Sequence, residues 1–423
     1  MTRIWTAIAA VTMGTALGSA ALAGDVRIMW YSDGNEGEVM EDLVARFRAD
    51  HPEINLTLEN VAYQVIKEQL PIQLAAGEGP DIARITDLKK EAPHFLDLTP
   101  YLRDPDYWRE NFGAQLDWMR PDRTDIIPGF MTQLTLTGGF ANATLFEQAG
   151  VPLPGPEATW DEWVEAAARV AESQQLEAAI AIDRSGHRIT GPMISEGAKL
   201  IGEDGMPAPL DDAARGFLTK LIGWTEDGRN LRDVWVSAAG ATYRPAADEF
   251  INATVPYYYA GSWQVANLSA TVGDAFDWVA TGSPCGVAGC TGIPGGAALV
   301  AIRSTPNPEE VATVMEWFAQ EDIVREFSER TLFLPAHKAV VEKGGLDFQT
   351  DDENARAALN AFVAATGQLT EEAQRIPAWT PASDVYAALA KRLGEAMAGE
   401  LSTEDALARI DSDIAEAMTA AAQ

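Results

Sequence analysis

The fold is decided by the stretch VRIMWYSDGNEGEVMEDLVARF, which occupies residues 26–47. Its first six residues, 26–31, are mainly apolar and aromatic and predict a strand. A polar loop that contains glycine follows at residues 32–37. From residue 39 to residue 47 the apolar residues recur at the spacing of one helical face. A strand, a polar loop and a helix in this order begin an α/β unit.

The same pattern continues further along the chain. Residues 54–58 alternate between apolar and polar side chains and predict a second strand. Residues 63–76 have a helical pattern, within which Pro71 predicts a kink or a break. Residues 81–85 predict a third, short strand. This β-α-β-α-β order predicts a largely parallel sheet with helices on its faces.

The length and two breaks in the pattern indicate more than one domain. A chain of 423 residues exceeds what a single hydrophobic core usually supports. One break is expected at residues 130–137, and the other is the glycine-rich stretch 281–296. Both predict boundaries between lobes.

The N-terminus has the features of a secretory signal peptide. Arg3 precedes a run of small and apolar residues at 4–17, and Ala21-Leu22-Ala23 forms a cleavage motif. The alternative is a membrane anchor, but the run is short and is interrupted by Gly14 and Gly18. The residue after the motif is glycine rather than cysteine, which favours a free periplasmic protein over a lipid-anchored one. We therefore expect residues 1–23 to be removed and the product to be soluble.

The composition excludes some partners. The formal net charge of −32 repels nucleic acid and anionic lipid surfaces. This acidity is typical of a soluble surface, although an acidic face could also meet a basic patch on a membrane partner.

The cysteine content limits the disulfide and metal chemistry that the chain can support. Cys285 and Cys290 are the two cysteines, and neighbouring thiols in an oxidising compartment should form a disulfide. Closing so short a loop contributes only about 2 kcal/mol. A metal site would need further ligands, so we expect neither metal nor cofactor.

The motifs of hydrolases, zinc proteases and nucleotide-binding loops do not occur. Residues 183–187 contain the residue types of a catalytic triad, but triad members normally converge from separate elements.

Four segments form a recognisable series along the chain: GEGPDI at 77–82, residues 142–163 ending in TWDEW, YAGSW at 259–263, and residues 294–335 beginning PGGAALV and ending in Leu-Pro. In order and spacing they resemble the extracellular solute-binding proteins of ABC transporters, in particular the group that includes maltose- and other sugar-binding proteins. The resemblance covers essentially the whole chain from residue 26 onward.

The resemblance implies an α/β fold of two lobes, with a hinge and a ligand cleft between the lobes. Lobe one would contain residues 24–132 and 294–341, and lobe two residues 133–293 and 342–423. The lobes would close on the ligand by hinge motion. The closed state would then dock on the membrane permease.

A sugar needs an aromatic ring for its C–H face and fixed donors and acceptors for its hydroxyls. By the resemblance Trp263 is expected to stack on the ligand, and Trp379 is a second aromatic candidate. Core packing is the alternative for Trp263, since the chain contains 12 tryptophans.

The polar candidates come mainly from loops beyond strand ends, where open α/β sheets bind ligands. Helix capping is the alternative role for Asp33 and Asn35. The arginines among the candidates would also suit an acidic or phosphorylated sugar, so neutral and charged sugars both remain open. The candidates are Ser32, Asp33, Asn35, Glu36, Arg84, Thr86, Asp87, Gln133, Asp183, Arg184, His187, Gly295, Gly296, Arg330 and Thr331.

Together these features predict a periplasmic, monomeric sugar-binding protein of an ABC importer that is not an enzyme. Its partners would be a carbohydrate and the transmembrane subunits of a permease, and nucleic acid is excluded. The first alternative is a secreted glycoside hydrolase or lyase. The second keeps the fold and changes the ligand to a polyamine, a metal or a sugar phosphate.

Overall fold

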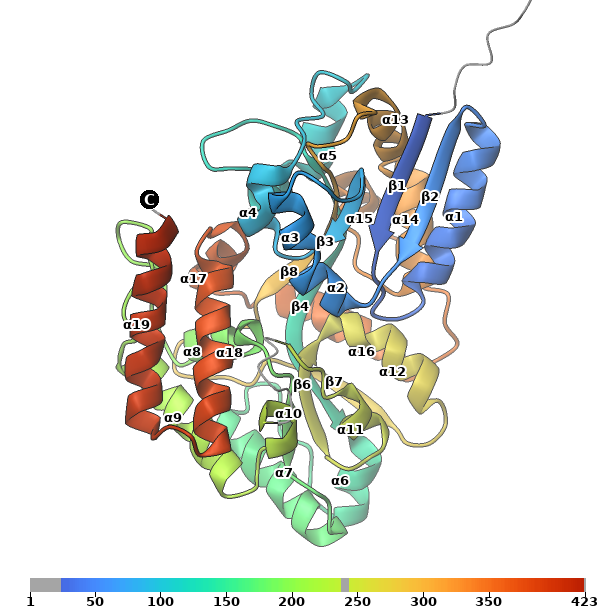
Figure 1. Cartoon of the computed structure of the whole chain (residues 1–423). Helices are drawn as coiled ribbons and strands as arrows, with labels where there is room; N and C mark the ends of the chain where they lie inside the picture. Colours follow the sequence, from blue (N-terminus) through green and yellow to red (C-terminus); the bar gives the residue numbers. More distant parts are fainter. Residues whose placement is uncertain (1–23, 237–242, 422–423) are drawn as a thin grey trace, which may run out of the picture.

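A computed structural model describes residues 24–236 and 243–421, so the predicted signal peptide at 1–23 lies outside the described residues. The molecule has an upper and a lower half, and β4 and β8 run between them (Figure 1). The strands are β1 (Gly24–Trp30), β2 (Ile54–Asn60), β3 (Ile82–Ile85), β4 (Gly129–Asn142), β5 (Ile180–Ile182), β6 (Tyr257–Gly261), β7 (Trp278–Gly282) and β8 (Pro294–Ala301).

The strands pair in the order β2-β1-β3-β8-β4-β6-β5, and β7 also pairs with β4. The expected parallel arrangement holds for β1 with its neighbours β2 and β3, and for β5 with β6. The expectation of a largely parallel sheet is wrong, because β8 is antiparallel to β3 and β4, and β4 is antiparallel to β6 and β7. β4 leaves the upper half and β8 returns to it, so the two strands run in opposite directions.

The break expected at residues 130–137 is a continuous strand. The first part of β4 pairs with β8, from Gly129 opposite Val300 to Leu136 opposite Pro294. The second part pairs with β6, beginning at Thr137. Residues 130–137, FMTQLTLT, are rich in alternating apolar and β-branched residues, which suit a strand better than a loop. β4 is therefore one of the strands that link the two halves.

The upper half places helices on both faces of β2, β1, β3 and β8. The predicted break around Pro71 is confirmed, because α2 ends before Gln69 and Pro71 lies in the first turn of α3. The helices of this half are α1 (Glu36–Asp50), α2 (Tyr63–Glu68), α3 (Leu70–Ala75), α4 (Leu88–Glu91), η1 (Ala92–His94), α5 (Pro105–Met119), α13 (Pro308–Phe318), α14 (Glu321–Thr331) and α15 (Lys338–Lys343).

The lower half surrounds β5, β6, β7 and the end of β4. Its α7 begins at a capping box in which Thr159 and Glu162 each accept a backbone N–H from the other residue. The helices are α6 (Ala143–Ala149), α7 (Trp160–Gln174), α8 (Gly186–Ser195), α9 (Asp212–Glu226), α10 (Arg232–Val236), α11 (Ala247–Ile251), η2 (Ser262–Gln264), α12 (Val265–Val272), α16 (Glu353–Thr366), α17 (Glu371–Arg375), η3 (Ile376–Ala378), α18 (Ala382–Ala398) and α19 (Thr403–Ala421).

The C-terminal helices complete the lower half. α16 packs on β7 and α12, and α18 packs on α8, α10 and α19. α18 and α19 stand side by side at one edge of the molecule (Figure 1). The expected disulfide between Cys285 and Cys290 is present, in the loop that leads from β7 to β8. Within the described residues no helix is both long and apolar enough to cross a membrane.

Candidate ligand-binding site

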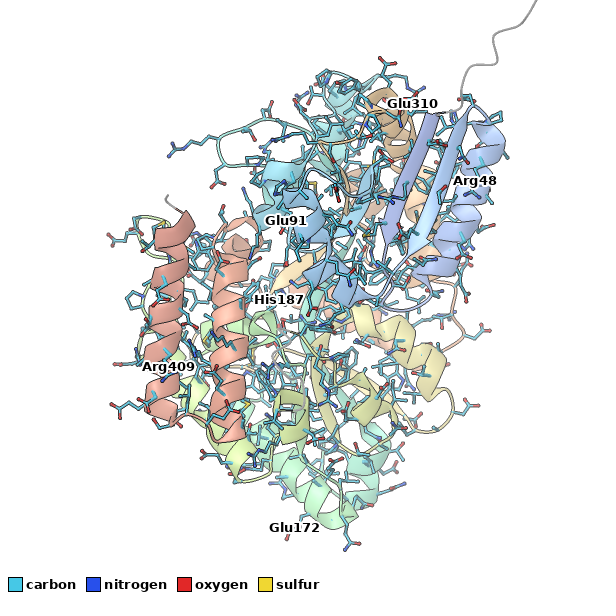
Figure 2. All side chains as sticks on the ribbon, viewed as in Figure 1. Arg48, Glu91, Glu172, His187, Glu310 and Arg409 are labelled. Carbon is cyan, nitrogen blue, oxygen red and sulfur yellow. A yellow bond between two sulfur atoms is a disulfide. The ribbon has the colours of Figure 1, made fainter. Side chains whose placement is uncertain are left out.

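A cavity of about 300 Å³ lies between the two halves. His187 lines this cavity and lies near the middle of the molecule (Figure 2). The upper half contributes the segments that follow β1 and β3, together with α2, and the lower half contributes α8, η2 and α18. The predicted site residues that line it are Asp33, Thr86, Asp87, Gln133, His187, Trp263, Gly295, Gly296 and Trp379.

The rule for strand ends accounts for several of these residues. β1 and β3 are parallel neighbours, so the loops after them meet at one edge of the sheet. That edge faces the cavity and carries Asp33 and Asp87. In the lower half β5 leads into α8, whose first turn carries His187.

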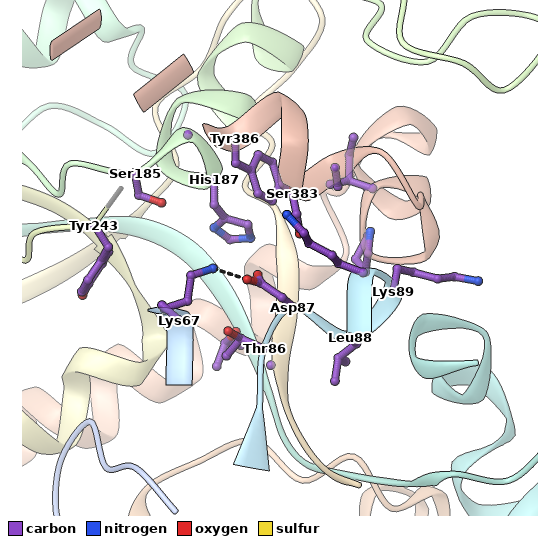
Figure 3. A pocket seen from close by; sticks show the side chains of 18 of the residues that line it. Lys67, Thr86, Asp87, Leu88, Lys89, Ser185, His187, Tyr243, Ser383 and Tyr386 are labelled. Atoms are coloured by element: carbon purple, nitrogen blue, oxygen red, sulfur yellow. Dashed lines mark hydrogen bonds and ion pairs between the residues drawn. The ribbon is translucent and has the colours of Figure 1, made fainter. Parts of the chain in front are cut away.

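Lys67 and Asp87 form an ion pair within the cavity wall. The Lys67 ammonium donates a short hydrogen bond to Asp87, and the pair lies beside the His187 ring (Figure 3). Burial is the largest influence and opposes the charged form of Lys67, but the charge and hydrogen bond of Asp87, together with Tyr63 and Glu91, outweigh it, and the pKa of Lys67 is raised.

Arg84 and Glu36 support the loop after β1 from behind and do not line the cavity. The Arg84 guanidinium is fully buried, 3.3 Å from Glu36 and 3.5 Å from Asp33, and it lies over the Tyr31 ring. Glu36 accepts the backbone N–H groups of Asp33 and Gly34. These two predicted residues therefore shape the loop and hold Asp33 in place.

Asp33 itself faces the cavity. Burial raises the pKa of its carboxyl to about 7, although Arg84 opposes that rise. Helix capping, the alternative role for Asp33 and Asn35, is not what the structure shows. Neither side chain caps α1, and the Asn35 amide instead donates to the carbonyl of Arg330.

Arg188 is a cavity residue that sequence reasoning missed. Its Nε donates to Asp183 at 3.2 Å, and its guanidinium lies 4.1 Å from the centre of the Trp263 ring. Another nitrogen of the same guanidinium is 2.9 Å from Nδ1 of His187. Arg188 therefore joins three of the predicted residues, and its own position in α8 gave no signal in the sequence.

The remaining predicted residues lie outside the cavity lining. Asp183 is fully buried beneath Arg188 and accepts from the Ala246 N–H and the Tyr258 hydroxyl. Arg184 donates to the Trp235 carbonyl, and Arg330 pairs with Asp42 and Glu326. Ser32 and Thr331 also lie away from the cavity. The triad residue types at 183–187 do not form a triad, because Asp183 pairs with Arg188.

The cavity has more aromatic surface than the two predicted tryptophans supply. Tyr31 and Tyr63 lie 4.7 Å apart between ring centres, and Tyr63 meets Tyr243 edge-on at 5.3 Å. Tyr386 and Trp118 complete the set. These residues come from distant parts of the chain, so no sequence motif could have grouped them.

Cross-contacts hold the two halves together at the rim. Lys90 of α4 lies 3.3 Å from Asp384 of α18, and the Thr380 hydroxyl donates to Asp122 at 3.2 Å. Among the described residues no group of three or more His, Cys, Asp or Glu side chains is placed to hold a metal ion.

Two halves around a polar and aromatic cavity define a ligand-capturing protein of the two-lobe class. The sequence model of the bacterial extracellular solute-binding protein family matches residues 31–324. The chain belongs to this family. Binding proteins of Brucella abortus and Brucella suis are 23% identical over 401 residues and match 88% of this chain and 88% of their own.

Solved structures share the fold over nearly the whole chain. The GacH receptor of Streptomyces glaucescens, solved unliganded and with acarbose, has a TM-score of 0.75 at 18% identity, covering 92% of this chain and 97% of its own. Lmo0181 from Listeria monocytogenes, in complex with cycloalternan, has a TM-score of 0.76 at 16% identity, covering 94% and 99%. Maltose-bound MalE3 of T. maritima has a TM-score of 0.73 at 18% identity, covering 93% and 99%.

Proposed function

We propose that this protein is the saccharide-binding component of an ABC importer. It captures a sugar or short oligosaccharide between its halves and delivers it to the transmembrane permease. The observation that carries the proposal is the cavity, where aromatic rings and fixed polar groups from both halves face one space. Such a lining suits the apolar faces and the hydroxyls of a saccharide. The neighbours solved with acarbose, cycloalternan and maltose support the same ligand class.

The charges around the cavity favour a neutral saccharide over an acidic or phosphorylated one. Among the described residues each cation of the lining has an acidic partner: Lys67 has Asp87, Lys89 has Asp122, Lys90 has Asp384 and Arg188 has Asp183. A ligand carboxylate or phosphate would have to compete with these carboxylates. We expect D-glucuronate to bind more weakly than D-glucose, its neutral counterpart.

The proposed hinge lies in the strands that join the two halves. The proposed lobes are residues 24–132 with 294–341 and residues 133–293 with 342–423. β4 and β8 would bend between them, and the connection from α15 to α16 would form a third crossing. Closure of one lobe on the other would enclose the ligand.

The remaining parts of the proposal concern where and how the protein works. The family is extracellular, and cleavage after Ala23 would release a free periplasmic monomer. N-terminal sequencing of the secreted protein tests the cleavage site. The protein would bind its sugar without turning it over and would not bind nucleic acid.

The test is calorimetric titration of the secreted protein with maltose, acarbose, cycloalternan and D-glucose. We expect at least one to bind with a dissociation constant of about 1 μM, or roughly −8 kcal/mol. Chromatography of the recovered saccharide should show it unchanged. Failure of every saccharide to bind, or the appearance of hydrolysis products, contradicts the proposal.

A further inference from the structure

The contact between Arg188 and His187 fixes the position of a proton. The Arg188 nitrogen Nη1 lies 2.9 Å from Nδ1 of His187. A guanidinium carries only donors, so Nδ1 must be the acceptor in this hydrogen bond. A neutral imidazole has one protonated nitrogen, and here that nitrogen is Nε2.

Arg188 is itself held on two sides. Its Nε donates to Asp183, a fully buried carboxylate that also accepts from the Ala246 N–H and the Tyr258 hydroxyl, each at 2.9 Å. Its guanidinium lies 4.1 Å from the Trp263 ring centre. These contacts leave the guanidinium little freedom to turn away from His187.

The Nε2 side of the ring lies beside Gly295, which also lines the cavity. Among the residues that the structure describes, Nε2 has no hydrogen-bond partner, and His187 lines the cavity. Position 295 is glycine, and a Cβ there would lie 3.7 Å from Nε2. The missing side chain at Gly295 therefore keeps space open beside this donor.

The groups around His187 oppose its protonation. Arg188 faces it from α8, Lys67 from α2 and the Tyr386 ring from α18, while Asp87 is engaged by Lys67. Burial, and then the positive charges of Arg188 and Lys67, lower the pKa of His187 well below 6.5. The ring is therefore neutral at neutral pH.

We propose that Arg188 is a positioning residue that holds His187 as a neutral imidazole with its proton on Nε2, so that the cavity presents a directed hydrogen-bond donor to a ligand oxygen. The ligand part of this proposal rests on the proposed function, but the protonation state belongs to the protein alone. A donor flanked by two cations selects an acceptor oxygen, such as a hydroxyl, ether or ring oxygen of a saccharide. It rejects the ammonium groups of a polyamine.

The protonation state can be measured without any ligand. The protein is labelled with ¹⁵N-histidine, and long-range proton–nitrogen spectra are recorded from pH 5 to pH 8. The signal of His187 is assigned by its loss in His187→Gln, and the other three histidines serve as internal references. We expect a ring protonated at Nε2 alone over the whole range. A ring that titrates near pH 6.5, or that carries its proton on Nδ1, overturns the proposal.

A double variant tests whether Arg188 is the cause. Arg188→Met alone would leave Asp183 buried without its partner, so it is combined with Asp183→Asn, which removes both charges together. In the double variant we expect His187 to show mixed tautomers and a pKa shifted toward 6.5. A spectrum identical to that of the unaltered protein would assign the tautomer to some other contact and overturn the role of Arg188.

Binding shows whether the donor is used. A glutamine amide can place an N–H near the position of Nε2, whereas phenylalanine fills the space without a donor. We expect His187→Phe to bind maltose, acarbose or cycloalternan roughly 10-fold more weakly than His187→Gln does. Equal affinities would show that the ligand does not use this donor. If neither these three saccharides nor D-glucose binds the unaltered protein, the proposed function fails, while the spectra still decide the role of Arg188.

Discussion

At the scale of single residues, Asp33 gives the cavity a pH dependence. Its carboxyl has an ordinary pKa of 3.8, and burial raises that value to about 7. Between these two values the folded chain holds a proton that the unfolded chain has released. The free energy of unfolding therefore falls as the pH rises through this range.

The variant Asp33→Asn removes this titration and keeps the shape of the neutral acid. We expect its stability relative to the unaltered protein to improve steadily from pH 4 to pH 7. Urea unfolding at several pH values measures the difference. A difference that stays constant with pH would show that Asp33 keeps its ordinary pKa.

Trp263 is the residue on which we expect saccharide binding to depend most. Its side chain is only 7% exposed, and Arg188 lies over its ring, so the indole both packs and lines the cavity. We expect Trp263→Ala to remove most of the thermal shift that a saccharide produces. The unaltered protein should be stabilised by about 2.7 kcal/mol at 100 times the dissociation constant. An unchanged shift would exclude Trp263 from the site.

Residues that follow strands could be predicted from the sequence, because the parallel order of β1 and β3 brings their loops together. Asp33 and Asp87 are predicted in this way, and His187 is predicted because it follows β5. Arg188 could not be predicted as a cavity residue, because its role depends on its contacts with Asp183 and Trp263, which only the tertiary fold creates. Arg84 is a predicted ligand-binding residue near the end of β3, but it supports the loop after β1 and does not line the cavity. A strand pattern does not show whether a side chain supports a loop or faces a cavity.

At the scale of elements, local signals predicted local structure. The break at Pro71 depends on a few neighbouring residues, and the structure confirms it. The direction of β8 and the continuity of β4 depend on how the chain crosses between the halves. A local pattern does not contain that information, so the mixed sheet could not be predicted.

The capping box provides a prediction and a control. Thr159→Ala removes the side chain that accepts the Glu162 N–H, and we expect it to lower stability by roughly 1 kcal/mol. Because α7 lies outside the cavity lining, saccharide affinity should be unaltered. Chemical unfolding and calorimetry measure the two quantities. A loss of affinity here would show that general destabilisation, and not the cavity, explains losses in the cavity variants.

At the scale of the whole molecule, we expect the contacts across the rim to favour the closed arrangement of the two halves under the proposed hinge motion. The ion pair between Lys90 and Asp384 is substantially exposed, so we expect it to contribute less than about 1 kcal/mol. Asp384→Asn should therefore weaken saccharide binding by only about threefold. It should also increase the radius of gyration of the ligand-free protein in small-angle scattering. A tighter complex, or an unchanged radius with unchanged affinity, would show that this pair does not favour closure.

The central claim is that a saccharide binds between the two halves and contacts both. Hydrogen–deuterium exchange of the secreted protein, with and without the saccharide that binds most tightly, tests it most directly. We predict slower exchange in segments of both halves that face the cavity, around residues 63–67 and 86–90 of the upper half and 185–188 and 261–263 of the lower half. Protection confined to one half, or located away from these segments, would contradict the account.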